Sequence, residues 1–269
     1  MSREAQEVAW PHLGKEIFVA NWKMNGSLAF VEAYGARLLE QHSTISKKAC
    51  VVVCSPTPYL KTLRDAVQGA VFLGSQNTAT AQSGAFTGEM SANMAADIGC
   101  RYGLVGHSER RRLYHENDTI VVEKALRLVE AGVVPILCIG ETEEQREMNE
   151  TAEVLHQQLR HISSLGPTSG LIVAYEPVWA IGTGKTPTPD NVQKTHRIIY
   201  EILEEHGLCN VPLLYGGSVT ATNAGDFLAL KEVQGVLVGG ASLKTDEFLQ
   251  IIQCLDKISQ ASVHCSLDQ

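Results

Sequence analysis

The sequence lacks the features that mark several common classes of protein. No stretch of about 18 apolar residues occurs, so no membrane span is predicted. No cluster of Lys and Arg is present and the formal net charge is −8, which argues against nucleic acid as a partner. The seven cysteines are odd in number and contain no Cys-x-x-Cys pair, which indicates reduced thiols. The first 15 residues have no apolar core and therefore do not resemble a signal peptide, and we expect a soluble, cytoplasmic protein.

Motifs of several enzyme classes are missing as well. There is no His-Glu-x-x-His and no Gly-x-Ser-x-Gly, so neither a metal nor another cofactor is predicted. The segment Gly182-Thr183-Gly184-Lys185-Thr186 resembles the end of a P-loop, but Trp179 stands where that motif requires its first glycine. A P-loop also runs directly into a helix, whereas here we expect the next helix to begin only at Pro189, with Thr188 as its cap.

What the chain does contain is a regular alternation of short apolar runs with longer amphipathic ones. At 269 residues and 44% apolar content it can bury a large core. Residues 118–131 are the clearest helix, with Gly132 as its stop. Eight runs are rich in Val, Ile and Leu, as parallel strands buried on both faces are: 17–20, 50–54, 70–74, 102–105, 134–139, 171–175, 212–215 and 236–238.

Eight strand–helix units of about 30 residues predict a single α/β domain, a (β/α)8 barrel over residues 16–258. We expect residues 1–15 to be an N-terminal extension and residues 259–269 a polar C-terminal tail, both mobile. The main alternative is a doubly wound sheet. Its Gly-x-Gly-x-x-Gly turn is absent after the first strand, where the sequence reads Asn21-Trp22-Lys23-Met24-Asn25-Gly26.

Polar residues and glycines cluster directly after the predicted strands. In a barrel these carboxyl ends gather on one face, where active sites of such enzymes lie. The clusters that follow six of the strands are Asn21 and Lys23; Gln76 and Asn77; His107, Ser108 and Glu109; Glu176; Gly216, Gly217 and Ser218; and Gly239 and Gly240.

Three of these side chains suit acid–base chemistry. Glu176 ends an apolar run and precedes a loop, residues 177–187, that carries glycines inside it and prolines at its ends, as a closing lid would. His107 precedes a predicted helix, whose dipole disfavours the protonated imidazole, and a neutral imidazole can donate to a developing oxyanion. Lys23 lies between apolar neighbours at a strand end and can meet a phosphate or a negative charge.

Each of these residues also has a simpler interpretation. A lone His or Lys is usually solvated, and most glycine pairs are simple turns. The position of the Gly216 and Gly239 turns, after strands seven and eight, favours a phosphate site built from backbone N–H groups. One carboxylate, one imidazole, one ammonium, a phosphate site and a lid together suit proton abstraction next to a carbonyl.

Five segments in chain order then carry a resemblance to a known family: Ala20-Asn21-Trp22-Lys23-Met24-Asn25, Gly106-His107-Ser108-Glu109-Arg110-Arg111, Ala174-Tyr175-Glu176-Pro177-Val178-Trp179-Ala180-Ile181-Gly182-Thr183-Gly184, Tyr215-Gly216-Gly217-Ser218-Val219 and Leu237-Val238-Gly239-Gly240-Ala241-Ser242. They resemble the motifs of the triosephosphate isomerases, over roughly residues 16–255. The resemblance implies interconversion of dihydroxyacetone phosphate and D-glyceraldehyde 3-phosphate, with Glu176 as base and His107 as electrophile.

The same resemblance implies the remaining site residues and a partner. Asn21 and Lys23 resemble the groups that hold the substrate and stabilise the enediolate, and Gly182, Ser218, Gly239 and Gly240 resemble the backbone donors to phosphate. A homodimer is implied, joined through the loop Gln76 to Glu89, where Phe86 is expected to be an exposed anchor.

Two alternatives stay open from the residues alone. Another barrel that acts on a sugar phosphate, such as an epimerase or an indole-forming synthase, would share the phosphate site but would not need the Glu176 lid or the Asn21-x-Lys23 pair. A binding protein that kept the fold and lost the chemistry would be expected to have lost Lys23, His107 or Glu176, and all three are present.

Overall fold

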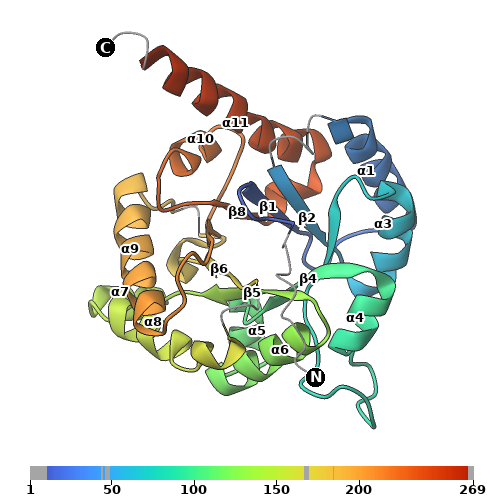
Figure 1. Ribbon diagram of the computed structural model, residues 1–269, viewed down its shortest axis with the longest axis horizontal. Coiled ribbons are helices and arrows are strands. Elements are labelled where there is room, and N and C mark those ends of the chain that lie inside the picture. Colours follow the sequence, from blue (N-terminus) through green and yellow to red (C-terminus); the bar gives the residue numbers. More distant parts are fainter. Residues whose placement is uncertain (1–10, 44, 46–48, 167–169, 184, 266–269) are drawn as a thin grey trace, which may run out of the picture.

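The computed structural model describes residues 11–43, 45, 49–166, 170–183 and 185–265, with side chains described up to residue 255. At its centre eight parallel strands form a closed barrel, in which β8 pairs with β1 (Figure 1). This confirms the predicted (β/α)8 barrel, because a doubly wound sheet would leave two open edges. The strands are β1 Glu16–Asn21, β2 Ala49–Cys54, β3 Phe72–Ser75, β4 Cys100–Val105, β5 Val134–Ile139, β6 Ile172–Tyr175, β7 Leu213–Tyr215 and β8 Gly235–Val238.

The strands are buried on both faces, as their apolar sequences predict. In β1, Ile17 and Val19 belong to a cluster of side chains inside the barrel, whereas Phe18 packs in the layer between strands and helices. The barrel closes where Ile17 of β1 pairs with Gly235 of β8. A Cβ atom on Gly235 would lie 1.9 Å from the Ile17 carbonyl oxygen, so only glycine fits at this junction.

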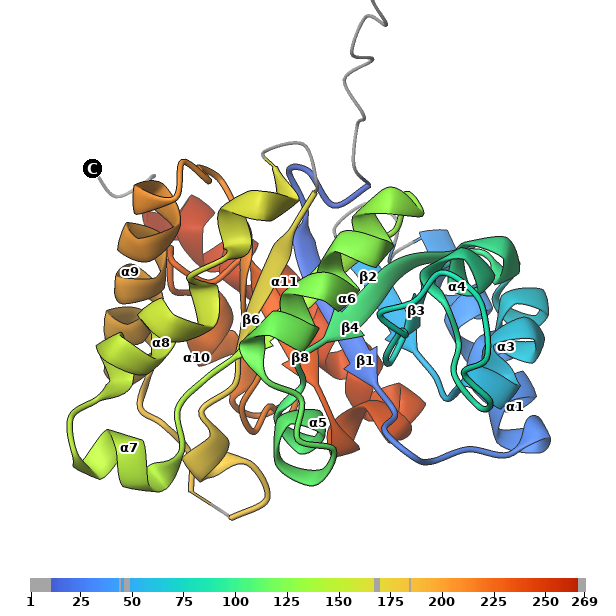
Figure 2. The same ribbon diagram turned by 90° about the horizontal axis from the view of Figure 1, so that it is seen from below.

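Helices surround the barrel (Figures 1 and 2). The predicted helix 118–131 is confirmed as α6, and the predicted start of a helix at Pro189, with Thr188 as cap, is confirmed as well. The α-helices are α1 Leu28–Glu40, α3 Leu60–Val67, α4 Ala92–Ile98, α5 Ser108–Leu113, α6 Asp118–Glu130, α7 Glu143–Glu147, α8 Thr151–Leu159, α9 Pro189–Glu205, α10 Ala224–Leu228 and α11 Thr245–Cys265. The 3₁₀ helices are η1 Thr57–Tyr59, η2 Ile162–Leu165, η3 Val178–Ala180 and η4 Gly240–Leu243.

Several boundaries differ from those expected from the sequence; β4, for example, begins at Cys100 rather than at residue 102. Strand β3 begins at Phe72 rather than at residue 70, because the left-handed Gln68 and Gly69 end α3 in a turn that includes Ala70. Helix α11 continues to Cys265, so residues 259–265 of the expected tail have a helical backbone. Residues 1–10 of the expected extension and residues 266–269 of the tail lie outside the described residues.

The amino end of the barrel is closed by side chains. His12 is buried, and its Nδ1 lies 3.4 Å from the Tyr102 hydroxyl, which in turn lies 3.3 Å from Cys50 Sγ. Burial lowers the pKa of His12 to about 4, so the ring is neutral at pH 7. The open end of the barrel is therefore the carboxyl end, where the predicted site residues lie.

Candidate active site

One cavity at the carboxyl ends of the strands contains every site residue predicted from the sequence. Its volume is about 380 Å³. Residues that are far apart in the chain meet here because all eight strands run in the same direction. The predicted residues that line the cavity are Asn21, Lys23, His107, Glu176, Gly182, Ser218, Gly239 and Gly240. Gly184, which belongs to the predicted lid, lies outside the described residues.

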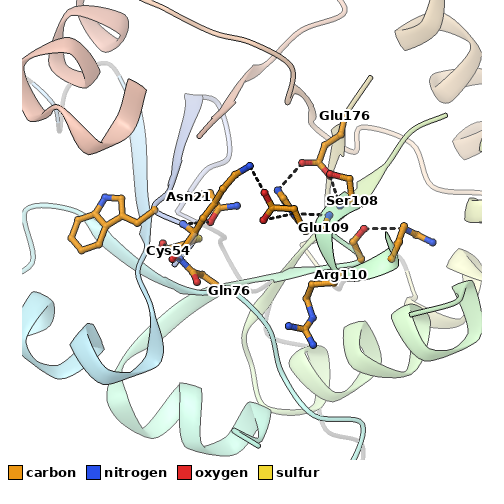
Figure 3. Close-up of polar contacts among 12 residues, drawn as sticks. Asn21, Cys54, Gln76, Ser108, Glu109, Arg110 and Glu176 are labelled. Carbon is orange, nitrogen blue, oxygen red and sulfur yellow. Dashed lines mark hydrogen bonds and ion pairs between the residues drawn. The ribbon is translucent and has the colours of Figure 1, made fainter. Parts of the chain in front are cut away.

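Glu176 directly follows β6 and is 2% exposed. Its Oε2 accepts a hydrogen bond of 2.9 Å from the Ser108 backbone N–H, and its Oε1 lies 3.0 Å from His107 Nε2 (Figure 3). Burial raises the pKa of this carboxyl group, but His107, the Ser108 N–H and Lys23 lower it, and the net direction is downward. The result is a buried and ionised carboxylate, which is the state that a general base requires.

His107 is the N-cap of α5. Its Nδ1 accepts a hydrogen bond of 3.2 Å from the Glu109 backbone N–H, which only an unprotonated Nδ1 can accept. The proton therefore resides on Nε2, facing Glu176. Burial lowers the pKa of His107, whereas the charge of Glu176 and the hydrogen bond to it raise that pKa, and the net direction is upward. This differs from the downward shift predicted from the helix terminus, because Glu176 outweighs the helix dipole in this arrangement.

Lys23 lies just past β1 in a left-handed conformation, with φ = 52°. Its Nζ lies 2.6 Å from Glu109 Oε1, and its backbone N–H donates to Asn21 Oδ1 at 3.0 Å. The Gln76 side chain donates to the Lys23 carbonyl at 2.9 Å, which holds the unusual backbone in place. A positive φ is uncommon for a residue with a side chain, so this conformation is consistent with a position fixed by function.

Glu141 is a residue that the sequence argument missed. It is fully buried, and its Oε1 accepts from the Tyr175 hydroxyl and from Trp179 Nε1, both at 3.0 Å. It therefore anchors the start of the predicted lid, residues 177–187, to the end of β5. The signal was present in the sequence, because Glu141 follows the apolar run of β5 as Glu176 follows β6, but no cluster was noted after strand five, as none was after strand two.

A second buried charge cluster lies behind the Lys23 side of the site. Glu116 Oε1 accepts from Arg110 Nε at 2.6 Å and from Lys124 Nζ at 2.5 Å, and Lys124 also donates to Asn77 Oδ1 at 2.8 Å. Burial lowers the pKa of Lys124, although Glu116 opposes that shift. Lys124 is nevertheless buried on α6, because Glu116 compensates its charge.

Next to the active-site cavity lies a larger one of about 1070 Å³. It shares Asn21, Lys23 and His107 with the site, and apolar side chains that are more than half exposed line it: Met24, Met94, Leu113 and Tyr114. Phe86, in the neighbouring loop, is 53% exposed, as predicted. Large exposed apolar side chains that gather around one hollow are typical of binding surfaces.

The six cysteines whose side chains are described are free thiols, and only Cys209 among them is exposed. Within the described ranges no group of three or more His, Cys, Asp and Glu side chains could hold a metal ion. Of the helices described, none is both long enough and apolar enough to cross a membrane.

Fold and site together define a (β/α)8-barrel enzyme with a carboxylate–imidazole pair and glycine turns at the carboxyl ends of its strands. A family model described as triosephosphate isomerase matches residues 16–255. Relatives named triosephosphate isomerase include those of Hahella chejuensis, 44% identical over 89% of this chain and 98% of the relative, and Nitrosococcus oceani, 42% identical over 88% and 97%. That of Chlamydia trachomatis is 42% identical over 92% and 94%. The chain belongs to the triosephosphate isomerase family, whose members are aldose–ketose isomerases.

Proposed function

We propose that this enzyme interconverts dihydroxyacetone phosphate and D-glyceraldehyde 3-phosphate, a reaction of glycolysis and gluconeogenesis, in the cytoplasm and without a cofactor. The observation that carries the proposal is the meeting of Glu176, His107 and Lys23 with two glycine turns around one cavity. The substrate needs a base, an oxyanion donor and a phosphate site, and this cavity has a candidate for each. We assign the catalysis to the barrel of residues 16–258.

The proposed reaction moves protons within one molecule. Glu176 removes a proton from the carbon next to the carbonyl, and His107 Nε2–H donates to the carbonyl oxygen as negative charge develops there; these roles are the ones known for the family. In the resulting enediol, Glu176 returns its proton to the neighbouring carbon while the hydroxyl on the first carbon gives its proton to His107 Nε2, so the new carbonyl forms and both residues regain their starting state. No electron leaves the substrate, so the reaction needs no redox partner. Before this can occur, the substrate must separate Glu176 Oε1 from His107 Nε2, which lie 3.0 Å apart.

Binding of the substrate is assigned to the remaining residues. Lys23 Nζ compensates the charge of the enediolate, with Asn21 fixing its backbone. Backbone N–H groups at Gly182, Ser218, Gly239 and Gly240 hold the phosphate, as glycine turns after strands seven and eight do in such barrels. Gly182 belongs to the lid of residues 177–187, and its closure keeps water from the enediolate and suppresses loss of phosphate.

The test of this proposal is a coupled assay of triose phosphate conversion with Glu176→Asp. The shorter side chain withdraws the carboxylate by about 1 Å, which is expected to lower kcat by roughly 10²-fold. Glu153→Asp makes the same change at an exposed position of α8 and controls for the substitution itself. A wild type without activity, or a Glu176→Asp variant as active as Glu153→Asp, contradicts the assignment.

We further propose that the enzyme is a homodimer in which the loop Gln76 to Glu89 enters the 1070 Å³ hollow of the partner. The base of this loop is held by a hydrogen bond from the Ala79 N–H to the Met90 carbonyl, which leaves Phe86 at the exposed tip. A partner loop that fills the hollow would contact the Lys23 side of the site. The double variant Phe86→Ser with Thr87→Arg is expected to sediment as a poorly active monomer, and a stable dimer at nanomolar concentration would refute this interface.

A further inference from the structure

Gln158 of α8 binds the backbone at the end of strand β5, next to the candidate base. Helix α8 lies in the outer layer beside α9, with β5 and β6 on its inner side (Figure 1). The Gln158 side chain reaches Gly140, the residue that follows β5 and lies directly against Glu176. We propose that Gln158 is a positioning residue for Glu176, because it fixes the backbone against which Glu176 packs. This inference rests on the proposed isomerase function.

Two hydrogen bonds join the side-chain amide of Gln158 to the backbone of Gly140. The Gly140 N–H donates to Gln158 Oε1 at 2.8 Å, and Gln158 Nε2 donates to the Gly140 carbonyl at 3.0 Å. A primary amide presents a donor and an acceptor side by side, so it can exchange both bonds with one residue as a neighbouring strand does. Gln158 therefore acts as the strand partner of buried Gly140 at the point where β5 ends.

Gly140 lies so close to Glu176 that no residue with a side chain fits at its position. A Cβ atom on Gly140 would lie 1.8 Å from the Glu176 carbonyl oxygen and 2.7 Å from the Glu176 carbonyl carbon. The carbonyl of the preceding Ile139 accepts a hydrogen bond of 2.7 Å from the Glu176 N–H. The end of β5 thus contacts both the N–H and the carbonyl group of Glu176, and a shift of Gly140 is transmitted to Glu176 by direct contact.

The opposite side of Glu176 is bounded by the turn after β7, since β6 lies between β5 and β7 in the barrel. The Gly216 N–H donates to the Tyr175 carbonyl at 2.8 Å, and a Cβ atom on Gly216 would lie 3.0 Å from Glu176 Cγ. Glu176 is therefore enclosed between two glycine backbones. The turn at Gly216 supports one side of Glu176, and the two hydrogen bonds from Gln158 support the other.

Loss of the Gln158 hydrogen bonds should affect the chemical step rather than substrate binding. Neither Gly140 nor Gln158 is among the described residues that line the active-site cavity, so the proposed phosphate site stays complete without them. The base, in contrast, depends on exact placement, because a misplacement of 1 Å can cost about 10²-fold in rate. A residue that acts only through the position of the base changes kcat and leaves KM nearly the same.

The experiment compares Gln158→Met with Gln157→Met. Methionine has a similar length to glutamine and removes both hydrogen bonds, and Gln157 is the exposed neighbour on the same helix. The measured quantities are kcat and KM for triose phosphate isomerisation and the inhibition constant Ki of inorganic phosphate. We expect Gln158→Met to lower kcat by about tenfold, with KM and Ki within about twofold of the wild type. Gln157→Met should match the wild type in all three.

A second variant and an isotope effect separate positioning from a general loss of structure. Gln158→Glu keeps an acceptor for the Gly140 N–H but places a carboxylate oxygen, ionised at neutral pH, against the Gly140 carbonyl, so its kcat should be at least as low. Because the slowed step is removal of a proton from carbon, the deuterium isotope effect on kcat should be no smaller than in the wild type. Circular dichroism shows whether each variant is folded, and either folded variant of Gln158 is sufficient for the test.

Several results would overturn the role of Gln158 and leave the isomerase assignment intact. These are a Gln158→Met enzyme with the kcat of Gln157→Met, a Gln158→Glu enzyme with the kcat of the wild type, and a roughly tenfold change in KM or in Ki. A lower kcat with a smaller isotope effect would overturn it too, because a step other than proton removal would then be slowed. A wild type that does not isomerise triose phosphate overturns the proposed function and the inference with it.

Discussion

Gly216 has no side chain, and the Glu176 side chain lies next to the position that a Cβ atom would take. The substitution Gly216→Ala therefore tests how strongly catalysis depends on the position of Glu176. An added Cβ would lie 3.0 Å from Glu176 Cγ and 3.2 Å from the Tyr175 carbonyl oxygen, where ordinary contact begins at 3.4 Å. The φ of Gly216 is not in the left-handed region, so alanine can adopt the backbone there. The perturbation is therefore steric, and it is directed at the proposed base.

The size of the effect follows from that overlap. Glu176 Cγ must shift by at least the missing 0.4 Å to regain the 3.4 Å contact distance. The carboxylate beyond it then moves by about half an ångström. Because a misplacement of 1 Å can cost about 10²-fold in rate, we expect kcat to fall by roughly tenfold. Global stability should change by less than about 1 kcal/mol, since glycine-to-alanine changes in a compatible backbone are small.

The assay is steady-state kinetics of triose phosphate isomerisation, with urea unfolding monitored in parallel. Gly225→Ala is the matched control, because a Cβ there meets no atom within 4 Å. A Gly216→Ala enzyme within twofold of the wild-type kcat would show that Glu176 tolerates displacement, and the reasoning would fail. A large decrease in the free energy of unfolding would refute the reasoning too, because it would show that the added Cβ strains the backbone rather than displacing Glu176.

Two predictions concern stability. Glu116→Gln removes the charge that compensates buried Lys124 and should lower the free energy of unfolding by about 3–5 kcal/mol, measured in urea; an effect under about 1 kcal/mol would contradict a buried pair. Burial lowers the pKa of His12 and of His196 to about 4, whereas the pKa of histidine in an unfolded chain is about 6.5. Between pH 4 and about pH 6.5 the unfolded state therefore binds more protons than the folded state. The contribution of these two neutral rings to the free energy of unfolding should therefore be fully present above about pH 6.5 and be lost as the pH falls through 4, on the order of 3 kcal/mol per group. Over this pH range the free energy of unfolding of His196→Gln should decrease by less than that of the wild type.

Much of the fold was predictable because parallel strands buried on both faces have distinctive sequences. The apolar run of β5, for example, has the same limits in sequence and structure, residues 134–139. The start of β3 was less predictable, because Ala70 and Val71 are as apolar as the strand that follows them. Whether they join the strand depends on the left-handed turn at Gln68 and Gly69, and glutamine does not signal such a turn.

For the site as well, some features can be predicted from neighbouring residues in the sequence, whereas others depend on contacts that form only in the folded chain. Glu176 and His107 could be selected because each follows an apolar run. The direction of the His107 pKa shift could not, since it depends on the 3.0 Å distance to Glu176, a residue on another strand. Glu109 stood in a recognised motif, but its pairing with Lys23 follows only from the closed barrel that sets β4 and β1 around the same cavity.

The junction of Ile17 and Gly235 joins the first strand of the barrel to the last. Closing the ring brings together parts of the chain separated by nearly its whole length, a contact whose entropic cost makes it slow to form. Lys23, after β1, and the Gly239 turn, after β8, face the same cavity only once that junction exists. Recovery of catalytic activity during refolding should therefore lag behind the recovery of helix signal, and the part of that lag that does not depend on protein concentration reports closure of the barrel.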